Sequence, residues 1–262
     1  MCRNAADFGR TVERPENMGM GQDTAMADVQ FVRSAAGGYG QPAHAGIVGV
    51  SQPDVHAPEG RGDAYRITVV SAGVSEHSAT GRLGDAVAVR TQETLQRHGH
   101  ECELRHIALK DFAADIAVAA VDYHMSDALR GVFEQVISSD ALIAATPVFK
   151  ASYSGLFKSF WDIVDVDAIV NMPVVLVATG GSRRHALVPD TAMRSLFAFL
   201  RAIPTPTSLL AAGEDWGSAE LEARQRRAGE ELAAMILAGL RSTMAAADAD
   251  AAHDAPSQIP VR

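Results

Sequence analysis

Short apolar segments alternate with longer helix-forming segments along residues 65–243, and this alternation constrains the fold more than any other feature. The short segments span 65–71, 102–109, 141–146, 172–179 and 205–211; the first is rich in β-branched residues and the second alternates apolar and polar residues. Helical patterns span 78–98, 126–138, 154–164, 191–202 and 218–242. Strands that alternate with helices form a parallel sheet joined by right-handed crossovers. The sequence therefore predicts an α/β three-layer sandwich with a five-stranded parallel sheet, in the order 2-1-3-4-5.

Composition divides the chain into three parts. Residues 1–64 contain many Gly, Pro, Asp, Gln and Ala residues without sustained hydrophobic periodicity, so we expect a disordered N-terminal extension there. Residues 244–262, rich in Ala, Asp and Pro, are expected to form a disordered C-terminal tail. The remaining segment, 65–243, has the usual size of one compact domain.

Charge and cysteine content exclude several classes of protein. The formal net charge of −9 disfavours binding to nucleic acid or to anionic membranes. No apolar stretch reaches the roughly 18 residues that span a bilayer, and the N-terminus lacks the apolar core of a secretory signal. Two cysteines, Cys2 and Cys102, make neither a disulfide framework nor a metal site. These features predict a cytoplasmic protein with no metal, membrane or nucleic-acid partner.

A connection rich in hydroxyl groups, residues 71–81, follows the first predicted strand. A helix N-terminus presents unpaired amides and a partial positive charge, so a phosphate is favoured there. Ser75, Ser78 and Thr80 can add hydroxyl donors. Ser78 or Thr80 can equally cap the helix without any ligand. The glycine patterns of a P-loop and of a dinucleotide-binding fingerprint are both missing.

The segment 146–161 lies between a predicted buried strand and an amphipathic helix. Pro147 lacks a backbone donor, so we expect it to end the strand and begin a loop at the carboxyl edge of the sheet. Phe149, beside exposed backbone amides in that loop, suits a flat ring with polar edges. The segment therefore predicts one wall of a ligand site.

Paired glycines, Gly180 and Gly181, mark the exit of the fourth predicted strand and are followed by Ser182. Such a pair lets the backbone approach a ligand closely. A tight turn that needs positive φ explains the glycines equally well. Because the three loops follow strands that end at one edge of the sheet, we expect them to converge on a single ligand.

These three segments resemble the NAD(P)H-dependent FMN reductase family of flavodoxin-like proteins. The resemblance spans residues 65–217 and is carried by 71–80, by the sequence TPVFKASYSGLFK over 146–158, and by 179–182 with 185–187. It is closest to the reductase components that supply reduced flavin to two-component monooxygenases. The resemblance implies that the cofactor-binding residues are Ser71, Ser75, Ser78, Thr80, Pro147, Val148, Phe149, Thr179, Gly180, Gly181 and Ser182.

The resemblance also implies an activity, the transfer of hydride from NADPH or NADH to FMN. Ser71, Ser78 and Thr80 would hold the FMN phosphate, and the other two loops would line the isoalloxazine ring. Hydride transfer requires no acid–base side chain, so we assign no catalytic residue, and we expect His185 to pack or position its loop or the nucleotide. Arg183 and Arg184 either engage the phosphates of the pyridine nucleotide or form an ordinary solvated surface.

Assembly and partners follow from the same resemblance. Tyr153 stands where sulfonate-type reductases carry an extra aromatic residue in a bulged helix at the subunit interface, which implies a homodimer or homotetramer; a surface or core aromatic is the alternative. A flavin-dependent monooxygenase is the implied partner. Two other functions stay open: an FMN-containing reductase of quinones, azo compounds or metal ions, and a non-catalytic flavodoxin-like electron-transfer module.

Overall fold

The computed structural model describes residues 64–122 and 124–254. The extension expected over 1–64, apart from its last residue, and Cys2 lie outside the described residues. The last described element, α7 (Leu240–Asp254), runs past residue 243, so residues 244–254 of the expected tail are helical. The division of the chain at residues 64 and 243 stays a prediction.

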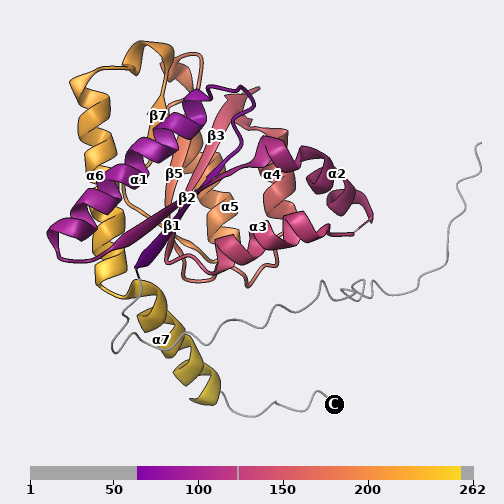
Figure 1. The fold of residues 1–262 in the computed structure, drawn as a ribbon, viewed down its shortest axis with the longest axis vertical. Coiled ribbons are helices and arrows are strands. Elements are labelled where there is room, and N and C mark those ends of the chain that lie inside the picture. The colour runs from indigo at the N-terminus through magenta and orange to yellow at the C-terminus, as the bar shows by residue number, and fades with distance from the viewer. Residues whose placement is uncertain (1–63, 123, 255–262) are drawn as a thin grey trace, which may run out of the picture. The chain divides into compact units, whose positions relative to one another are not determined.

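A mostly parallel sheet forms the centre of the fold (Figure 1). Its strands are β1 (Tyr65–Ser71), β2 (Cys102–Ala108), β3 (Ala141–Phe149), β5 (Pro173–Thr179), β6 (Ile203–Pro204) and β7 (Leu209–Ala211). The order is β2-β1-β3-β5-β6, and β7 also pairs with β5. The predicted order is therefore confirmed, with the last strand in two pieces. The short β4 (Ser152–Tyr153) pairs antiparallel with the end of β3.

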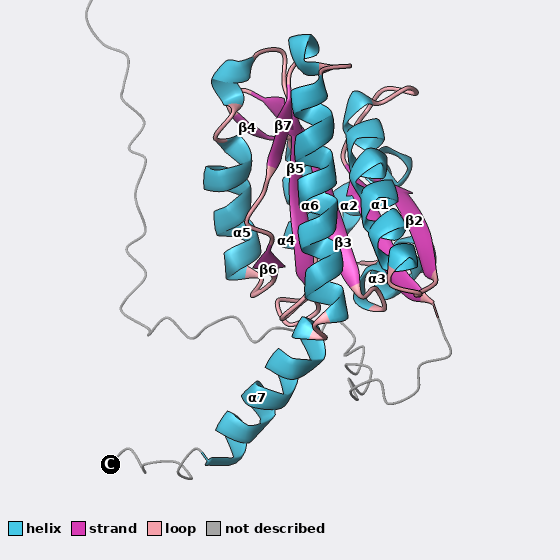
Figure 2. Ribbon diagram, turned by 90° about the vertical axis from the view of Figure 1, so that its left-hand side faces the viewer, coloured by secondary structure: helices cyan, strands magenta, loops and turns pink. Residues whose placement is uncertain are grey.

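Helices cover both faces of the sheet (Figures 1 and 2). One face packs against α1 (Ala79–Arg97) and α6 (Ala219–Leu237). The other face packs against α2 (Ala113–Asp122), α3 (Asp127–Ile137), α4 (Gly155–Asp162) and α5 (Arg194–Phe199). Side chains of β3 alternate between the two cores, because Leu142 belongs to one and Ile143 to the other.

Serine hydroxyls fix where four of the helices begin. Each accepts a hydrogen bond from the backbone amide three residues later, which satisfies one unpaired donor of the first turn. These N-caps are Ser78 of α1, Ser126 of α3, Ser154 of α4 and Ser218 of α6. All four are the residues at which the sequence predicts the helices to start.

Pro147 does not end β3, contrary to the prediction. The strand continues to Phe149, and Pro147 lies opposite Thr179 of β5. The carbonyl of Ala145 accepts a hydrogen bond from the amide of Ala72, so the backbone groups of Ala145 point towards β1. Because these groups alternate sides along a strand, those of Pro147, two residues later, point the same way. Because β1 pairs with β3 only as far as Ala145, the missing proline donor removes no ladder hydrogen bond.

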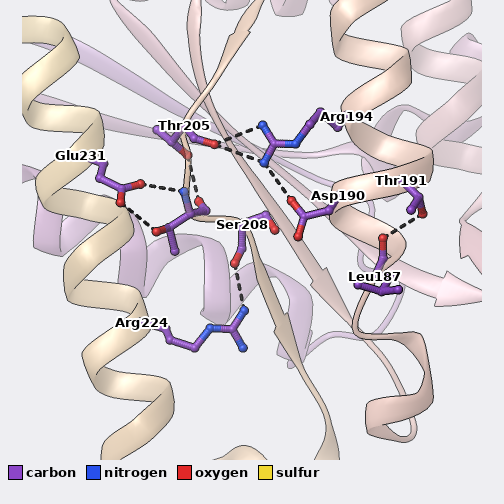
Figure 3. A network of polar contacts seen from close by, with 9 residues as sticks. Leu187, Asp190, Thr191, Arg194, Thr205, Ser208, Arg224 and Glu231 are labelled. Carbon is purple, nitrogen blue, oxygen red and sulfur yellow. Dashed lines mark hydrogen bonds and ion pairs between the residues drawn. The ribbon is translucent and has the colours of Figure 1, made fainter.

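The fifth predicted strand, 205–211, is interrupted at its start. Residues 205–208 leave the sheet between β6 and β7, and Pro206 removes a donor from this stretch. The Thr205 amide still donates to the Val174 carbonyl of β5 at 2.9 Å, and side chains of α5 and α6 satisfy other backbone groups of this stretch (Figure 3). Arg194 donates to the Thr205 carbonyl at 3.2 Å, Glu231 accepts from the Thr207 amide at 2.7 Å, and Arg224 donates to the Ser208 carbonyl at 2.9 Å.

Helix boundaries differ from the sequence prediction in three places. The terminal helix predicted over 218–242 breaks after α6, at Gly239, whose φ is 60°. The helix predicted over 191–202 is a π-helical turn, Pro189–Met193, followed by the six residues of α5. Between β2 and α3, the short helix Leu109–Phe112 and α2 occupy a stretch that the sequence leaves unassigned.

Two phenylalanines of α5 provide a matched test of the core. Phe197 is fully buried, 4.9 Å from the ring centre of Trp161, whereas Phe199 is 72% exposed. We expect Phe197→Ala to lower the free energy of unfolding by about 3–5 kcal/mol, because it leaves a cavity. Phe199→Ala should change it by no more than about 0.5 kcal/mol. Urea unfolding followed by circular dichroism measures both, and equal losses would contradict the assigned core.

Candidate functional site

Three loops meet where β1, β3 and β5 end. These strands are adjacent and parallel, so their carboxyl ends lie at one edge of the sheet. The hydroxyls of Thr80, in the first turn of α1, and Thr179, at the end of β5, lie 2.6 Å apart. Pro147 of β3 pairs with the same Thr179. The structure thus brings together predicted site residues from all three segments.

The loop after β1 folds closely over the start of α1. Ser71 is buried, and its hydroxyl accepts from the Gly73 amide at 3.3 Å. A Cβ atom on Gly73 would lie 1.7 Å from the Ser78 hydroxyl, so only glycine fits here. The Ser78 hydroxyl accepts from the Gly81 amide at 3.1 Å and so caps the helix, which is one of the two roles that the sequence allows for Ser78. Ser75 is exposed in the loop. The first-turn amides still provide the donors and positive potential that suit a phosphate.

A two-residue hairpin turn, rather than an open loop, follows β3. Lys150 and Ala151 have φ values of 51° and 69°, the pattern of a type I′ turn, and neither is glycine. The base of the hairpin is fixed because the buried Ser154 amide donates to the Thr146 hydroxyl at 3.0 Å. Phe149 stands beside this turn and is 50% exposed. The turn therefore presents an aromatic ring at the edge of the site.

Tyr153 lies in β4, and the structure corrects the prediction that associated it with a bulged helix. It pairs with Val148, and its ring lies 5.9 Å from that of Phe157 in the core. The following helix, α4, is regular, and the π-helical turn is at Pro189–Met193 instead. The aromatic ring therefore packs against the core from a strand.

The loop after β5 combines a closely packed glycine with a buried hydroxyl that has no partner. Gly180 donates its amide to the Ala211 carbonyl at 3.0 Å. A Cβ atom on Gly180 would lie 3.3 Å from the His185 ring, so His185 packs on this turn, as predicted. Among the described residues, the buried Ser182 Oγ atom has no hydrogen-bond partner. An unpaired buried hydroxyl is unfavourable, and a polar ligand atom at the turn would satisfy it.

Arg183 and Arg184 have different surroundings. Arg183 donates through Nε to Asp215 Oδ1 at 2.8 Å, whereas Arg184 is exposed and has no hydrogen bond or ion pair within the described ranges. The Ala212 amide and the Arg183 guanidinium hold the pKa of the Asp215 carboxyl below its ordinary value. Asp215 in turn raises the pKa of Arg183. Arg184 is therefore the cation of this pair that is open to a ligand.

Sequence reasoning missed the turn that supplies Asp215, the short helix Gly213–Asp215 after β7. The available signal was the acidic pair Glu214 and Asp215, which comes shortly after β7 at the same edge of the sheet as the three loops. The guanidinium of Arg82 lies over the ring of the next residue, Trp216, 5.1 Å from the ring centre. Arg82 follows Thr80 by two residues in α1, so the turn reaches two of the predicted loops.

Other reactive groups are scarce in the described part of the chain. Burial, followed by the charges of Asp140, Glu103 and Glu101, raises the pKa of the Cys102 thiol to about 12, which keeps it protonated. Within residues 64–122 and 124–254, no group of three or more His, Cys, Asp or Glu side chains could hold a metal ion. Over the same residues, no helix has the length and apolar character needed to cross a membrane. The site offers hydroxyls, amides, an exposed ring and one unpaired arginine.

Known proteins with similar sequences are FMN reductases. The family model described as NADPH-dependent FMN reductase matches residues 65–217. The FMN reductase (NADPH) of Pseudomonas aeruginosa is 34% identical over 177 residues, which cover 66% of this chain and 92% of that protein. The NADH-dependent FMN reductase SfnE of Pseudomonas putida is 36% identical over 169 residues, which cover 63% of this chain and 88% of that protein.

Solved structures agree with the fold. An oxidoreductase from Corynebacterium diphtheriae has a TM-score of 0.65 and 38% identity, covering 66% of this chain and 97% of its own. The apo form of the NADH:FMN oxidoreductase EMOB has a TM-score of 0.58 and 24% identity, covering 65% of this chain and 89% of its own. The strand order with helices on both faces is that of a flavodoxin-like sandwich, as predicted.

Gly73 provides a test of the first loop. The Cβ atom of Gly73→Ala would overlap the Ser78 side chain, so the loop must move. We expect the affinity for FMN to fall at least about tenfold, the equivalent of 1.4 kcal/mol, at the lower end of typical overpacking costs. Titration of flavin fluorescence measures the dissociation constant.

The matched control is Gly131→Ala in α3, where an added Cβ has no neighbour within 4 Å. This change should leave FMN affinity unchanged, and it removes a glycine from a helix interior. Wild-type affinity in Gly73→Ala would contradict the placement of the ligand at this loop.

Proposed function

The chain belongs to the NADPH-dependent FMN reductase family and is an FMN reductase that uses NADPH or NADH, and we propose that FMN binds where β1, β3 and β5 end. The observation that carries this placement is the 2.6 Å contact between Thr80 and Thr179, which joins two of the three loops. Those loops contain every residue that the resemblance assigns to the flavin. The unpaired hydroxyl of Ser182 in the third loop supports a polar ligand there.

The residues of the site divide into two groups in this proposal. Ser71, Ser75, Ser78 and Thr80, with the first amides of α1, hold the phosphate at the positive end of the helix. Residues 147–149 and residues 179–182 would line the ring. When bound, FMN would supply the redox chemistry, as the acceptor of hydride from the pyridine nucleotide. The protein binds and orients the reactants, and no side chain is assigned as an acid or base.

We further propose that the product, reduced flavin, passes to a partner monooxygenase in the cytoplasm, and that the reductase is a homodimer or homotetramer. The exposed apolar side chains at the edge of the site support exchange with a partner. Val74 and Leu187 lie in the loops after β1 and β5, Phe149 is the last residue of β3, and the three side chains are 59%, 68% and 50% exposed, respectively. Such side chains near one site favour contact with another molecule.

Steady-state kinetics test this function. Protein stripped of flavin should oxidise NADPH or NADH only when FMN is added. In the variant Phe149→Ala, the affinity for FMN should fall about tenfold because an aromatic contact is lost. Absorbance at the nicotinamide band follows the reaction. Tight FMN that survives purification, with ping-pong kinetics towards quinones or azo compounds, would favour the alternative of a prosthetic flavin. Bound flavin that neither nucleotide reduces would leave only an electron-transfer module.

Arg184 tests the nucleotide contact. It is exposed and unpaired in the described structure, so its guanidinium is available to a phosphate. We expect Arg184→Ala to raise KM for the nucleotide about tenfold, the equivalent of one charge-assisted hydrogen bond, without changing kcat. The control is Arg226→Ala, which removes another exposed arginine, on α6. A rise for NADPH alone assigns the contact to the 2′-phosphate, and a rise for both nucleotides assigns it to the pyrophosphate. An unchanged KM rejects the contact.

A further inference from the structure

The carboxylate of Asp215 joins two parts of the chain that border the proposed flavin site. Oδ2 accepts from the Ala212 amide at 2.8 Å, at the end of β7. Oδ1 accepts from Arg183 Nε at 2.8 Å, directly after Ser182. The Asp215 side chain is only 14% exposed, although Arg183 is mostly exposed. One side chain therefore uses both oxygens, one for its own turn and one for the neighbouring loop.

The Gly180–Ser182 turn is held at both ends, by the last residue of β7 and by the segment that follows β7. At its start, the Gly180 amide donates to the Ala211 carbonyl at 3.0 Å. At its end, Arg183 is bound by Asp215. Between these two contacts lies the buried Ser182 hydroxyl, which has no partner among the described residues. A turn that is fixed at both ends while one hydroxyl stays unpaired is prepared for a ligand atom.

The same short helix also reaches the phosphate-binding side of the site. Trp216 follows Asp215 and packs under the guanidinium of Arg82, on the first turns of α1. Thr80, two residues before Arg82, contacts Thr179 at the start of the glycine turn. Asp215 and Trp216 thus connect the segment after β7 with both sides of the proposed site.

We propose that Asp215 is a positioning residue for the flavin: through Arg183 it holds the Gly180–Ser182 turn in the position that binds the ring. This inference rests on the flavin site proposed above. Asp215 does not touch the flavin itself and acts through the backbone of the turn. Pre-organisation of this kind increases affinity because the turn loses less freedom when the ligand binds.

Asp215→Asn is the direct test, because asparagine keeps the size but offers only one acceptor oxygen. When the asparagine oxygen stays on the Ala212 amide, its NH2 group faces Arg183, which loses its partner. We expect the dissociation constant for FMN to rise about tenfold and the visible circular dichroism of bound flavin to change, while the apoprotein melts as wild type does. A purely structural role would instead lower the melting temperature and leave the spectrum of saturated protein unchanged, which would overturn the proposal.

Glu214→Gln is the matched control. Glu214 also lies near Arg183, but at 3.8 Å with both side chains more than half exposed, so solvent screens this pair. It should bind FMN as wild type does. Arg183→Met, which removes the guanidinium and keeps an unbranched stem, should weaken FMN binding as much as Asp215→Asn does. The double variant should be no weaker than either single one, because both changes break one contact. Additive losses in the double variant would overturn the proposal.

The outcomes separate this inference from the flavin site on which it rests. If Gly73→Ala and Phe149→Ala weaken FMN binding while Asp215→Asn does not, the site stands and the positioning role fails. If none of the three variants changes FMN affinity, the site itself is misplaced. A change in Asp215→Asn that Glu214→Gln shares would assign the effect to local charge and would also overturn the positioning role.

Discussion

Parallel pairing of β3 with both β1 and β5 is the constraint on which the rest of the structure depends. Residues 141–145 of β3 are completely buried, because helices cover both faces of the sheet at this strand. Parallel neighbours require a connection that returns across a face of the sheet, so helices follow β1, β2, β5 and β7, and α4 follows the β3–β4 hairpin. The same geometry that buries the core therefore collects three polar loops at one place.

Much of this arrangement could be predicted from local sequence. Short β-branched runs identify the strands, and Ser78, Ser126, Ser154 and Ser218 mark the helix starts because a hydroxyl there replaces a missing acceptor. The extension of β3 past Pro147 could not be predicted, since it depends on β1 ending two residues earlier in the ladder. The break between β6 and β7 could not be predicted either. Carbonyl groups of this segment accept hydrogen bonds from Arg194 of α5 and Arg224 of α6, which lie more than ten residues away in the sequence.

The candidate site, like the fold, could be predicted from the sequence only in part. Glycines and hydroxyls at strand ends identified three loops that the structure brings together, but not which of their groups are already hydrogen-bonded within the protein. Ser78 caps its helix, Thr80 and Thr179 bind each other, and Arg183 is bound to a residue 32 positions later in the chain. These pairings are tertiary, so the sequence could name Arg183 and Arg184 together but could not distinguish them. Of these two arginines, only Arg184 is without a hydrogen bond or ion pair in the described part of the chain.

The interruption between β6 and β7 also limits how molecules of this protein can associate. These strands form one outer margin of the sheet and contain two and three residues, separated by a proline-containing segment whose polar backbone is already bound. Short, interrupted outer strands give little template for another chain to join by backbone pairing. A continuous intermolecular sheet is therefore disfavoured on this side, and contacts between subunits here have to be made by side chains of helices and loops.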